Sequence, residues 1–421
     1  MPSTQQSPVA AAEPGATFDW GTRLAKRTAG GDGFLTGILA LANARGVINF
    51  SGGFPAPELF PTDTLSAIID GLLTTDAAVA LQYAPSDGIT STREAIADYL
   101  QAAEGHRPAI EELMITSGGI DAVTLIAKSM LDPGDVVAVE EPTYLGAVSG
   151  FVSFEPVLHG VPMDSDGLNV DALAELIERG VVPKMLYTIP EYQNPSGRTL
   201  SAERRVALVE LCRRHRILII EDVAYRELGF YDEKLPSLWS LAPDVVLQIG
   251  TFSKTFFPGV RLGWAAGPAA IVAQLVVAKQ NSDQCSGALG QRMVEQFLRG
   301  GHLPAQLERE RTLYRSRGEE MAAALARHLP QPATWTVPRG GFFSWVHVPG
   351  VNTVDLAAAA RAVDVAFVPG SPFFAESVQH DYLRLSFSRA QLPEIDEGIA
   401  RLARAIEQAR QSAPTSQETT A

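Results

Sequence analysis

The chain has 421 residues, of which 46% are hydrophobic and 19% are charged, and its formal net charge is −14. This length predicts two or three domains with a large buried core, and the acidic balance argues against nucleic acid as a partner, because few cations are left to bind phosphates. The sequence contains no apolar run of about 18 residues, so we expect no contact with a membrane. Two cysteines without zinc-ligand spacing exclude a disulfide framework, and we expect a cytoplasmic protein without a metal site.

Residues 1–17 and 410–421 are polar and aperiodic, and we expect both to be disordered tails. Between about residues 110 and 270, short apolar runs alternate with amphipathic helical stretches. The runs are 113–116, 135–139, 184–189, 217–220 and 244–249. Strands that are apolar throughout and alternate with helices predict an α/β fold with a mainly parallel sheet buried on both faces. We assign residues 61–290 to this large domain.

The pattern changes after residue 290. A long charged helical stretch over 290–328, interrupted near 300–302, precedes an aromatic segment at 341–347 and a last helix at 392–408. These elements predict a smaller α+β domain over 291–409. We expect the N-terminal segment 18–60 to join it.

Several polar and aromatic residues follow the predicted strands. Gly118 and Gly119 come after the first strand and open a helix, where backbone N–H groups can approach an anion. Tyr144 follows the second strand, Asn194 the third and Asp222 the fourth. Each residue alone is compatible with an ordinary turn, a packing ring or a surface strand end. Together they lie where parallel α/β sheets bind ligands, at the carboxyl ends of the strands.

Lys254 follows the fifth strand, and it is one of only 6 lysines beside 28 arginines. Its neighbours are apolar, and a desolvated lysine has a lowered pKa and can form a Schiff base with an aldehyde. Arg261 lies seven residues later. A lysine, an acid, an aromatic ring, an amide, a glycine turn and an arginine at one edge are the groups that pyridoxal 5′-phosphate (PLP) requires.

Three motifs carry a family resemblance: Asn-Pro-Ser-Gly at 194–197, Glu-Asp-Val-Ala-Tyr at 221–225, and Ser-Lys followed by Pro-Gly-Val-Arg-Leu-Gly over 253–263. They resemble the motifs of fold-type I, class I/II aminotransferases, over about residues 20–408. The opening 48–61 resembles the subgroup of 2-aminoadipate, kynurenine and aromatic aminotransferases. The resemblance implies a large and a small domain, a homodimer, and PLP-dependent transfer of an amino group from an amino acid to a 2-oxo acid by a ping-pong mechanism.

The resemblance also implies residue roles. Lys254 would bind the cofactor aldehyde and move the proton, Asp222 would pair with the ring nitrogen, and Tyr144 would stack on the ring. Hydrogen bonds to the phenolic oxygen are implied for Asn194 and Tyr225. The implied phosphate ligands are the turn Gly118, Gly119 and Ile120, the hydroxyls of Thr251 and Ser253, Arg261, and Tyr83 across the dimer interface.

The substrate site is implied to contain Arg384, which would bind the α-carboxylate, with Asn194 and Gly53. Aromatic residues in or near the implied site favour an apolar or aromatic substrate side chain: Phe54, Tyr83, Tyr192, Phe257 and Phe373.

Two segments depart from the subgroup. The phosphate turn reads Gly-Gly-Ile-Asp over 118–121 where Gly-Ser-Gln-Gln is usual, and Leu-Thr-Gly stands at 35–37 where Ile-Arg-Glu is usual. They leave open other PLP chemistry on the same scaffold: elimination, replacement, cyclisation or carbon–carbon bond formation. A third hypothesis, an effector-sensing regulator with a DNA-binding module, conflicts with the acidic charge and the short preceding segment.

Overall fold

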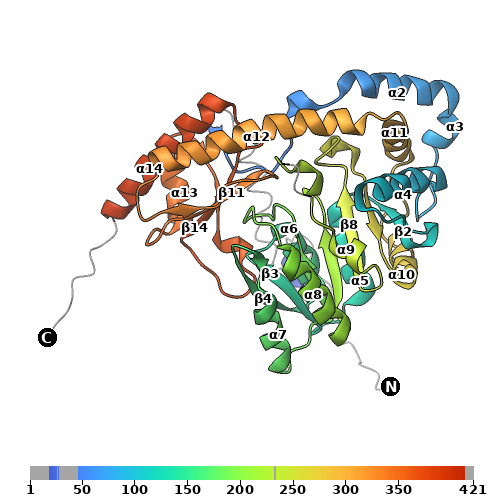
Figure 1. The fold of residues 1–421 in the computed structure, drawn as a ribbon, viewed down its shortest axis with the longest axis horizontal. Coiled ribbons are helices and arrows are strands. Elements are labelled where there is room, and N and C mark those ends of the chain that lie inside the picture. The colour runs from blue at the N-terminus through green and yellow to red at the C-terminus, as the bar shows by residue number, and fades with distance from the viewer. Residues whose placement is uncertain (1–18, 26, 28–45, 232–233, 413–421) are drawn as a thin grey trace, which may run out of the picture.

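The computed structural model describes residues 19–25, 27, 46–231 and 234–412. Its large unit is built on an eight-stranded sheet of order β2-β9-β8-β7-β6-β3-β4-β5 (Figure 1). The strands are β2 (Leu113–Thr116), β3 (Val136–Glu141), β4 (Val157–Asp164), β5 (Gly167–Leu168), β6 (Met185–Thr188), β7 (Leu218–Asp222), β8 (Val246–Thr251) and β9 (Gly263–Ala266). The prediction of an α/β fold with a mainly parallel sheet is confirmed; β9 is antiparallel to both β2 and β8, and β5 is antiparallel to β4.

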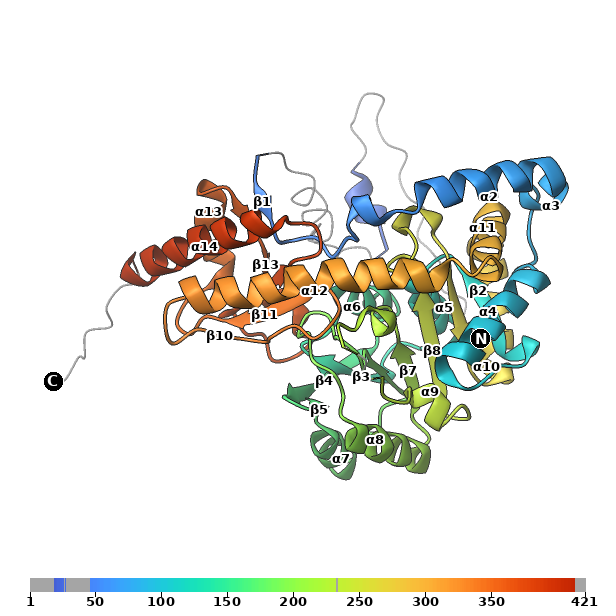
Figure 2. The ribbon, with the colours of Figure 1, turned by 45° about the horizontal axis from the view of Figure 1, so that its top comes forward.

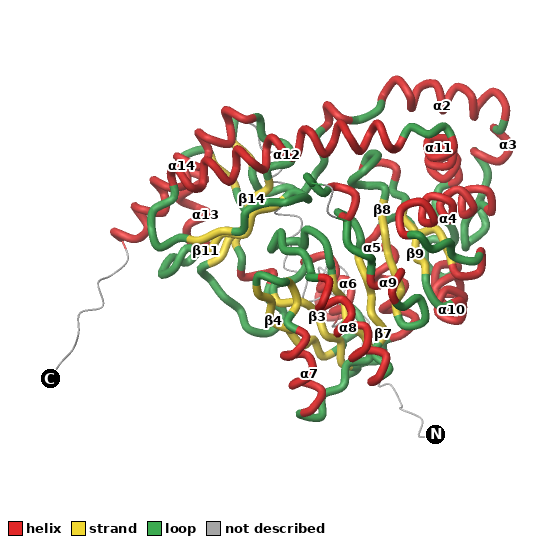
Figure 3. Tube along the Cα trace, viewed as in Figure 1, coloured by secondary structure: helices red, strands yellow, loops and turns green. Residues whose placement is uncertain are grey.

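Helices cover both faces of this sheet (Figure 3). Val137 and Val139 of β3 face the cluster that contains α5 and α6, whereas Ala138 between them faces the cluster with α4, α7 and α8. The helices of the unit are α2 (Thr62–Thr75), α3 (Ala77–Ala80), α4 (Thr90–Glu104), α5 (Gly119–Met130), α6 (Leu145–Val152), α7 (Val170–Glu178), α8 (Ala202–His215), α9 (Leu238–Leu241), α10 (Ala269–Gln280) and α11 (Ala288–Arg299). The inner strands β6, β7 and β8 are buried along their whole length, which explains why their sequences are mostly apolar.

The smaller unit contains an antiparallel sheet of order β10-β11-β14-β13. These strands are β10 (Thr334–Trp335), β11 (Phe343–His347), β13 (Val368–Pro369) and β14 (Tyr382–Ser386), packed with α12 (Leu303–His328), α13 (Thr353–Ala362) and α14 (Leu392–Ser412). In the N-terminal segment, β1 (Ile48–Asn49) pairs in parallel with β12 (Val365–Ala366), which attaches that segment to the small unit. Short 3-10 helices lie at Trp20–Arg23, Pro57–Leu59, Ile110–Glu112, Arg226–Leu228, Pro258–Val260 and Ser371–Phe373.

Two boundaries differ from those drawn on the sequence. The boundary at 290 falls inside α11, which packs against α2 and α4 of the large unit, so the small unit begins with α12. The last helix continues to Ser412, so residues 410–412 are helical rather than part of a tail. The expected tail 1–17, the departure at 35–37 and residues 413–421 lie outside the described residues.

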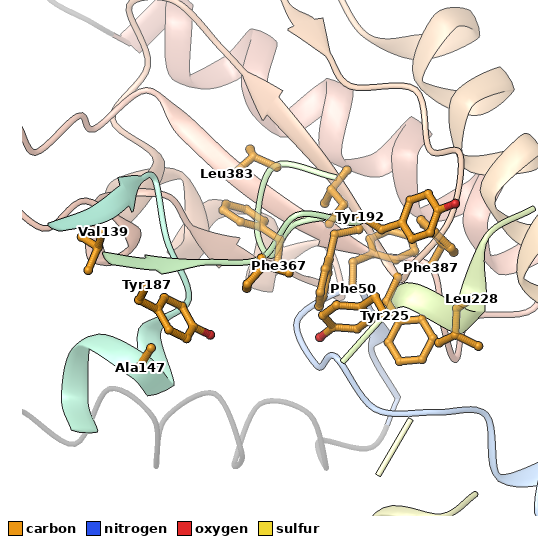
Figure 4. Packing of buried hydrophobic residues seen from close by; sticks show 14 of the residues in the cluster. Phe50, Val139, Ala147, Tyr187, Tyr192, Tyr225, Leu228, Phe367, Leu383 and Phe387 are labelled. Atoms are coloured by element: carbon orange, nitrogen blue, oxygen red, sulfur yellow. The ribbon is translucent and has the colours of Figure 1, made fainter. Parts of the chain in front are cut away.

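One long helix and one apolar cluster join the two units. α12 lies along α14 and β11 and extends toward α11 and α2 (Figure 2). Figure 4 shows part of the cluster, which combines Phe50 of the N-terminal segment, Tyr225 of the large unit and Phe387 of the small unit. The two units are therefore packed into one body around a shared core. No helix in the described ranges has the length and apolarity needed to cross a membrane.

Candidate active site

The carboxyl ends of β3, β6, β7 and β8 open into a cavity of about 350 Å³. The loops after these strands supply most of its polar lining, and the N-terminal segment, the start of α5, β11 and β14 supply the rest. The lining includes Gly53, Gly119, Ile120, Tyr144, Asn194, Asp222, Tyr225, Thr251, Ser253, Lys254, Arg261 and Arg384. The structure therefore brings together nearly all the residues that the strand ends and the resemblance singled out.

Lys254 stands in the turn after β8, and its side chain is partly buried in the cavity wall. Nζ donates a hydrogen bond to the carbonyl oxygen of Gly53 at 2.8 Å and lies 5.9 Å from the ring centroid of Phe342. Burial lowers the pKa of Lys254 to about 8; the cation of Arg384 adds to this effect, while Asp222 opposes it. The neutral, nucleophilic amine is thus accessible close to neutral pH.

Asp222 ends β7 and is also buried. Oδ2 accepts a hydrogen bond from the hydroxyl of Tyr187 at 2.7 Å, and Oδ1 accepts one from the backbone N–H of Ala224 at 3.0 Å. Burial raises the pKa of Asp222, and the hydrogen bond from Tyr187 opposes that rise. The carboxylate is held in a fixed orientation, where it can pair with a cationic ring nitrogen.

Two tyrosines and an amide line the same cavity. Tyr144 precedes α6, and burial raises its pKa to about 12; burial likewise raises the pKa of Tyr225 well above its usual value. Tyr225 is fixed by edge contacts with the rings of Phe342 and Phe343, at 5.5 and 5.7 Å. Both phenols therefore stay protonated at neutral pH and can donate hydrogen bonds.

The opposite end of the cavity is rich in donors. Arg261 lies before β9 in the left-handed region, and its Nη2 donates to the carbonyl oxygen of Ser117 at 3.1 Å. Gly118 has a φ of +94°, and a Cβ there would lie 2.6 Å from Arg261 Nη2. Glycine is therefore required for the guanidinium to lie against the turn. The hydroxyl of Thr251 donates a hydrogen bond to the hydroxyl of Ser253 at 2.9 Å, at the same end of the cavity.

Arg384 on β14 is buried at the junction of the two units. Nη1 donates to Asn194 Oδ1 at 2.9 Å and Nη2 to the carbonyl oxygen of Ser51 at 2.6 Å, while the rings of Phe343 and Phe373 lie 4.4 and 5.0 Å from the guanidinium. Its Nε is buried without a hydrogen-bond partner among the described residues. A buried cation with unused donors is suited to bind a carboxylate. Burial lowers its pKa to about 10, so the arginine remains charged at neutral pH.

Glu140, near the end of β3, holds the Asn194 loop through hydrogen bonds. Its carboxylate accepts hydrogen bonds from Thr188, from the Ile189 N–H at 3.2 Å and from Gln193 Nε2 at 2.9 Å. Burial raises the pKa of Glu140 to about 7, and these bonds oppose that rise. Glu140 therefore positions the loop that carries Asn194.

Three expected residues lie elsewhere. Tyr83 is 77% exposed and does not line the Lys254 cavity of its own chain. Tyr192 has a φ of +49° and turns its ring toward Gly229 and Gly340, into a separate cavity of about 570 Å³. The ring of Phe257 packs against that of Phe256 in a tilted arrangement and does not line the Lys254 cavity.

The sequence reasoning missed two contacts with the site residues. Ser51 was missed because its contribution is a backbone oxygen, which no motif marks. Tyr187 was missed because it lies inside an apolar strand and looks like a core residue.

The residues present fit PLP. A partly buried lysine, a fixed carboxylate, protonated phenols and a cation next to a glycine turn line one cavity. Two cationic side chains suit the binding of two anionic groups. Arg384 has an Nε without a partner among the described residues, and Arg261 lies close to the turn at Gly118.

Comparisons with known proteins agree with this fit to PLP. The family model "Aminotransferase class I and II" matches residues 45–402. The chain is 37% identical to the 2-aminoadipate transaminase of Thermus thermophilus, over 88% of this chain and 92% of that protein. It is 36% identical to aromatic-amino-acid aminotransferase 1 of Thermococcus litoralis, over 88% of this chain and 90% of that protein.

Among solved structures, the α-aminoadipate aminotransferase from Thermus thermophilus, complexed with N-(5′-phosphopyridoxyl)-L-leucine, superposes with a TM-score of 0.88 at 35% identity, covering 94% of this chain and 100% of that chain. The expected subgroup and the expected cofactor are confirmed. The chain belongs to the class I and II aminotransferase family and is a PLP-dependent aminotransferase of fold type I.

Proposed function

We propose that Lys254 is the residue that binds the PLP aldehyde and afterwards moves the proton at the substrate α-carbon. PLP, when bound, supplies an electron-accepting ring that stabilises negative charge on that carbon. The lowered pKa of Lys254 supports both roles, because capture of the aldehyde and removal of the proton each need a neutral amine. Asp222 holds a proton on the ring nitrogen, and Tyr187 keeps the carboxylate aligned for it.

The remaining residues orient the cofactor. Tyr144 would stack on the cofactor ring, and Asn194 and Tyr225 would donate hydrogen bonds to its phenolic oxygen; all three line the cavity. The phosphate is bound by the N–H groups of Gly119 and Ile120, at the start of α5, where the helix dipole favours an anion. Thr251, Ser253 and Arg261 add hydroxyl and charged donors to the same group.

The substrate in this proposal is an α-amino acid with an apolar or aromatic side chain. Arg384 binds its α-carboxylate, and Gly53 and Asn194 border the same part of the cavity. A Cβ at Gly53 would lie 2.6 Å from the ring of Phe343, so this approach to the cavity is closely packed. The apolar part of the lining includes Phe54, Val123, Leu145, Ile189 and Phe343.

A homodimer is part of the proposal. Tyr83 is exposed, as is Leu81 two residues before it, so an aromatic and an aliphatic side chain face solvent outside the cavity of their own chain. In a dimer, the hydroxyl of Tyr83 would reach the phosphate in the partner's cavity. A cytoplasmic location is also proposed; Cys212 and Cys285 are both free thiols, as is usual in a reducing compartment.

The observation that carries the proposal is the partly buried Lys254 amine in one cavity with Asp222, Arg261 and Arg384. The test is a panel of single amino acids added to the PLP-loaded protein. Phenylalanine and leucine should convert the bound cofactor to its pyridoxamine form, and a 2-oxo acid should reverse the change. Release of ammonia without that conversion, for every amino acid tried, would instead indicate elimination chemistry and refute the transamination roles. Sedimentation analysis of the same sample tests the dimer, which a monomer with full activity would contradict.

A further inference from the structure

A second buried lysine lies just behind the phosphate end of the cavity. Lys279, near the end of α10, has no exposed side-chain surface. Its Nζ lies 2.8 Å from Asp121 Oδ2, 2.9 and 2.8 Å from the two oxygens of Asp283, and 3.2 Å from Ser117 Oγ. The roles given above to the cavity residues do not use this ammonium.

This cluster is bonded to the turn that carries the phosphate donors. Asp121 Oδ2 also accepts the backbone N–H of Ser117 at 2.7 Å, and the hydroxyl of Ser117 donates to Asp283 at 2.6 Å. The carbonyl oxygen of Ser117 in turn accepts the hydrogen bond from Arg261. A continuous chain of contacts therefore runs from Lys279 through Ser117 to the guanidinium of Arg261.

Asp121 places a negative charge near the start of α5, and Lys279 pairs with it. Asp121 is the third residue of α5, directly after the two residues whose N–H groups bind the phosphate in the proposed arrangement. A carboxylate there favours the helix start but repels a phosphate dianion. An ammonium in contact with that carboxylate offsets the repulsion while leaving its hydrogen bond to Ser117 in place.

We propose that Lys279 is a positioning residue for cofactor binding: with Asp121 and Asp283 it fixes the Ser117 turn and Arg261, and it offsets part of the negative charge that Asp121 places beside the phosphate. The inference rests on the proposed placement of the phosphate at the start of α5. It also gives a physical account of the Gly-Gly-Ile-Asp turn, in which an aspartate is tolerated because a buried lysine pairs with it.

The test compares the affinity of the apoenzyme for PLP with its affinity for pyridoxal, which lacks the phosphate. The ratio of the two affinities isolates binding of the phosphate, whereas general damage to the fold lowers both. The variants are Lys279→Met, Asp121→Asn and the double variant. Lys128→Met is the matched control, because Lys128 bonds to the carbonyls of Ala278 and Asn281, at the same helix end, without touching the turn.

In Lys279→Met the PLP-to-pyridoxal ratio should fall by roughly tenfold or more, because the carboxylates of Asp121 and Asp283 then lie behind the phosphate site without their shared cation. Asp121→Asn should raise the ratio above that of the wild type, and in the Lys279→Met background it should restore much of the loss. Lys128→Met should leave the ratio unchanged.

A folded Lys279→Met protein with the wild-type ratio would overturn the proposal. If Lys279→Met does not fold, Asp121→Asn decides, and an unchanged or lowered ratio in that variant overturns the proposal. A wild-type protein that binds pyridoxal as tightly as PLP would overturn the phosphate placement itself, which separates that failure from failure of the role given to Lys279.

Discussion

Replacement of Arg384 by glutamine tests the proposed carboxylate site most sharply. The guanidinium has five N–H donors, of which the described contacts use two, on Asn194 and Ser51, and its Nε is buried without a partner in the part of the chain that the structure describes. A hydrogen bond to a charged group contributes about 1.5–3 kcal/mol, so loss of a two-bond contact with the substrate carboxylate costs about 3–6 kcal/mol. The expected fall in kcat/KM is therefore roughly 10²- to 10⁴-fold.

The assay compares an amino acid with the matching amine that lacks the α-carboxylate, for example phenylalanine with 2-phenylethylamine. Arg384→Gln should lower kcat/KM for the amino acid and leave the amine little changed, so that the preference between them collapses. Arg384→Lys keeps the charge but not the planar fork, and its kcat/KM for the amino acid should lie between those of the wild type and Arg384→Gln. Arg213→Gln, which removes a surface ion pair with Asp244, serves as the control. An equal loss for both substrates would refute the assignment of Arg384 to the carboxylate.

Three further changes test other parts of the site. Tyr187→Phe removes the 2.7 Å hydrogen bond to Asp222, and we expect the pKa of that carboxyl to rise further and kcat to fall by about five- to tenfold (about 1 kcal/mol) with little change in KM; an unaltered kcat would contradict this. Gly118→Ala places a methyl against Arg261 at a φ of +94°. Titration of the apoenzyme with PLP should therefore show an affinity lowered by at least about tenfold. An affinity equal to that of the wild type would contradict this expectation. The rate at which the apoenzyme captures PLP should rise with pH and level off above about pH 8, because the lowered pKa of Lys254 makes the neutral amine abundant above that pH. A stopped-flow rate that does not change through pH 8 would contradict this role of Lys254.

Much of this arrangement follows from the sequence, because parallel strands place their carboxyl ends at one edge. Tyr144, Asn194, Asp222 and Lys254 each follow an apolar run, so their meeting in one cavity could be predicted from the order of the strands alone. The direction of the individual strands was harder to predict. β9 has only four residues and follows a turn, and nothing in so short a run tells an antiparallel insertion from a loop.

Contacts between distant segments could not be predicted from local patterns. Lys279 lies in a helix that reads as apolar, and its partner Asp121 lies 158 residues earlier in the chain. Tyr187 occupies a strand position where an aromatic side chain is usually core, and its hydroxyl gains a role only through the neighbouring strand. Tyr192 was expected near the substrate, but its left-handed backbone turns the ring away. Such features depend on the tertiary arrangement rather than on spacing.

The most direct test of the role given to Lys254 is to reduce the PLP-loaded protein with borohydride, digest it, and locate the phosphopyridoxyl group by mass spectrometry. The modified peptide should contain Lys254, whose amine lies in the cavity, and Lys279, bonded to two carboxylates behind it, should stay unmodified. Modification of another lysine, or none at all in protein that has catalysed transamination, would show that a different group binds the aldehyde.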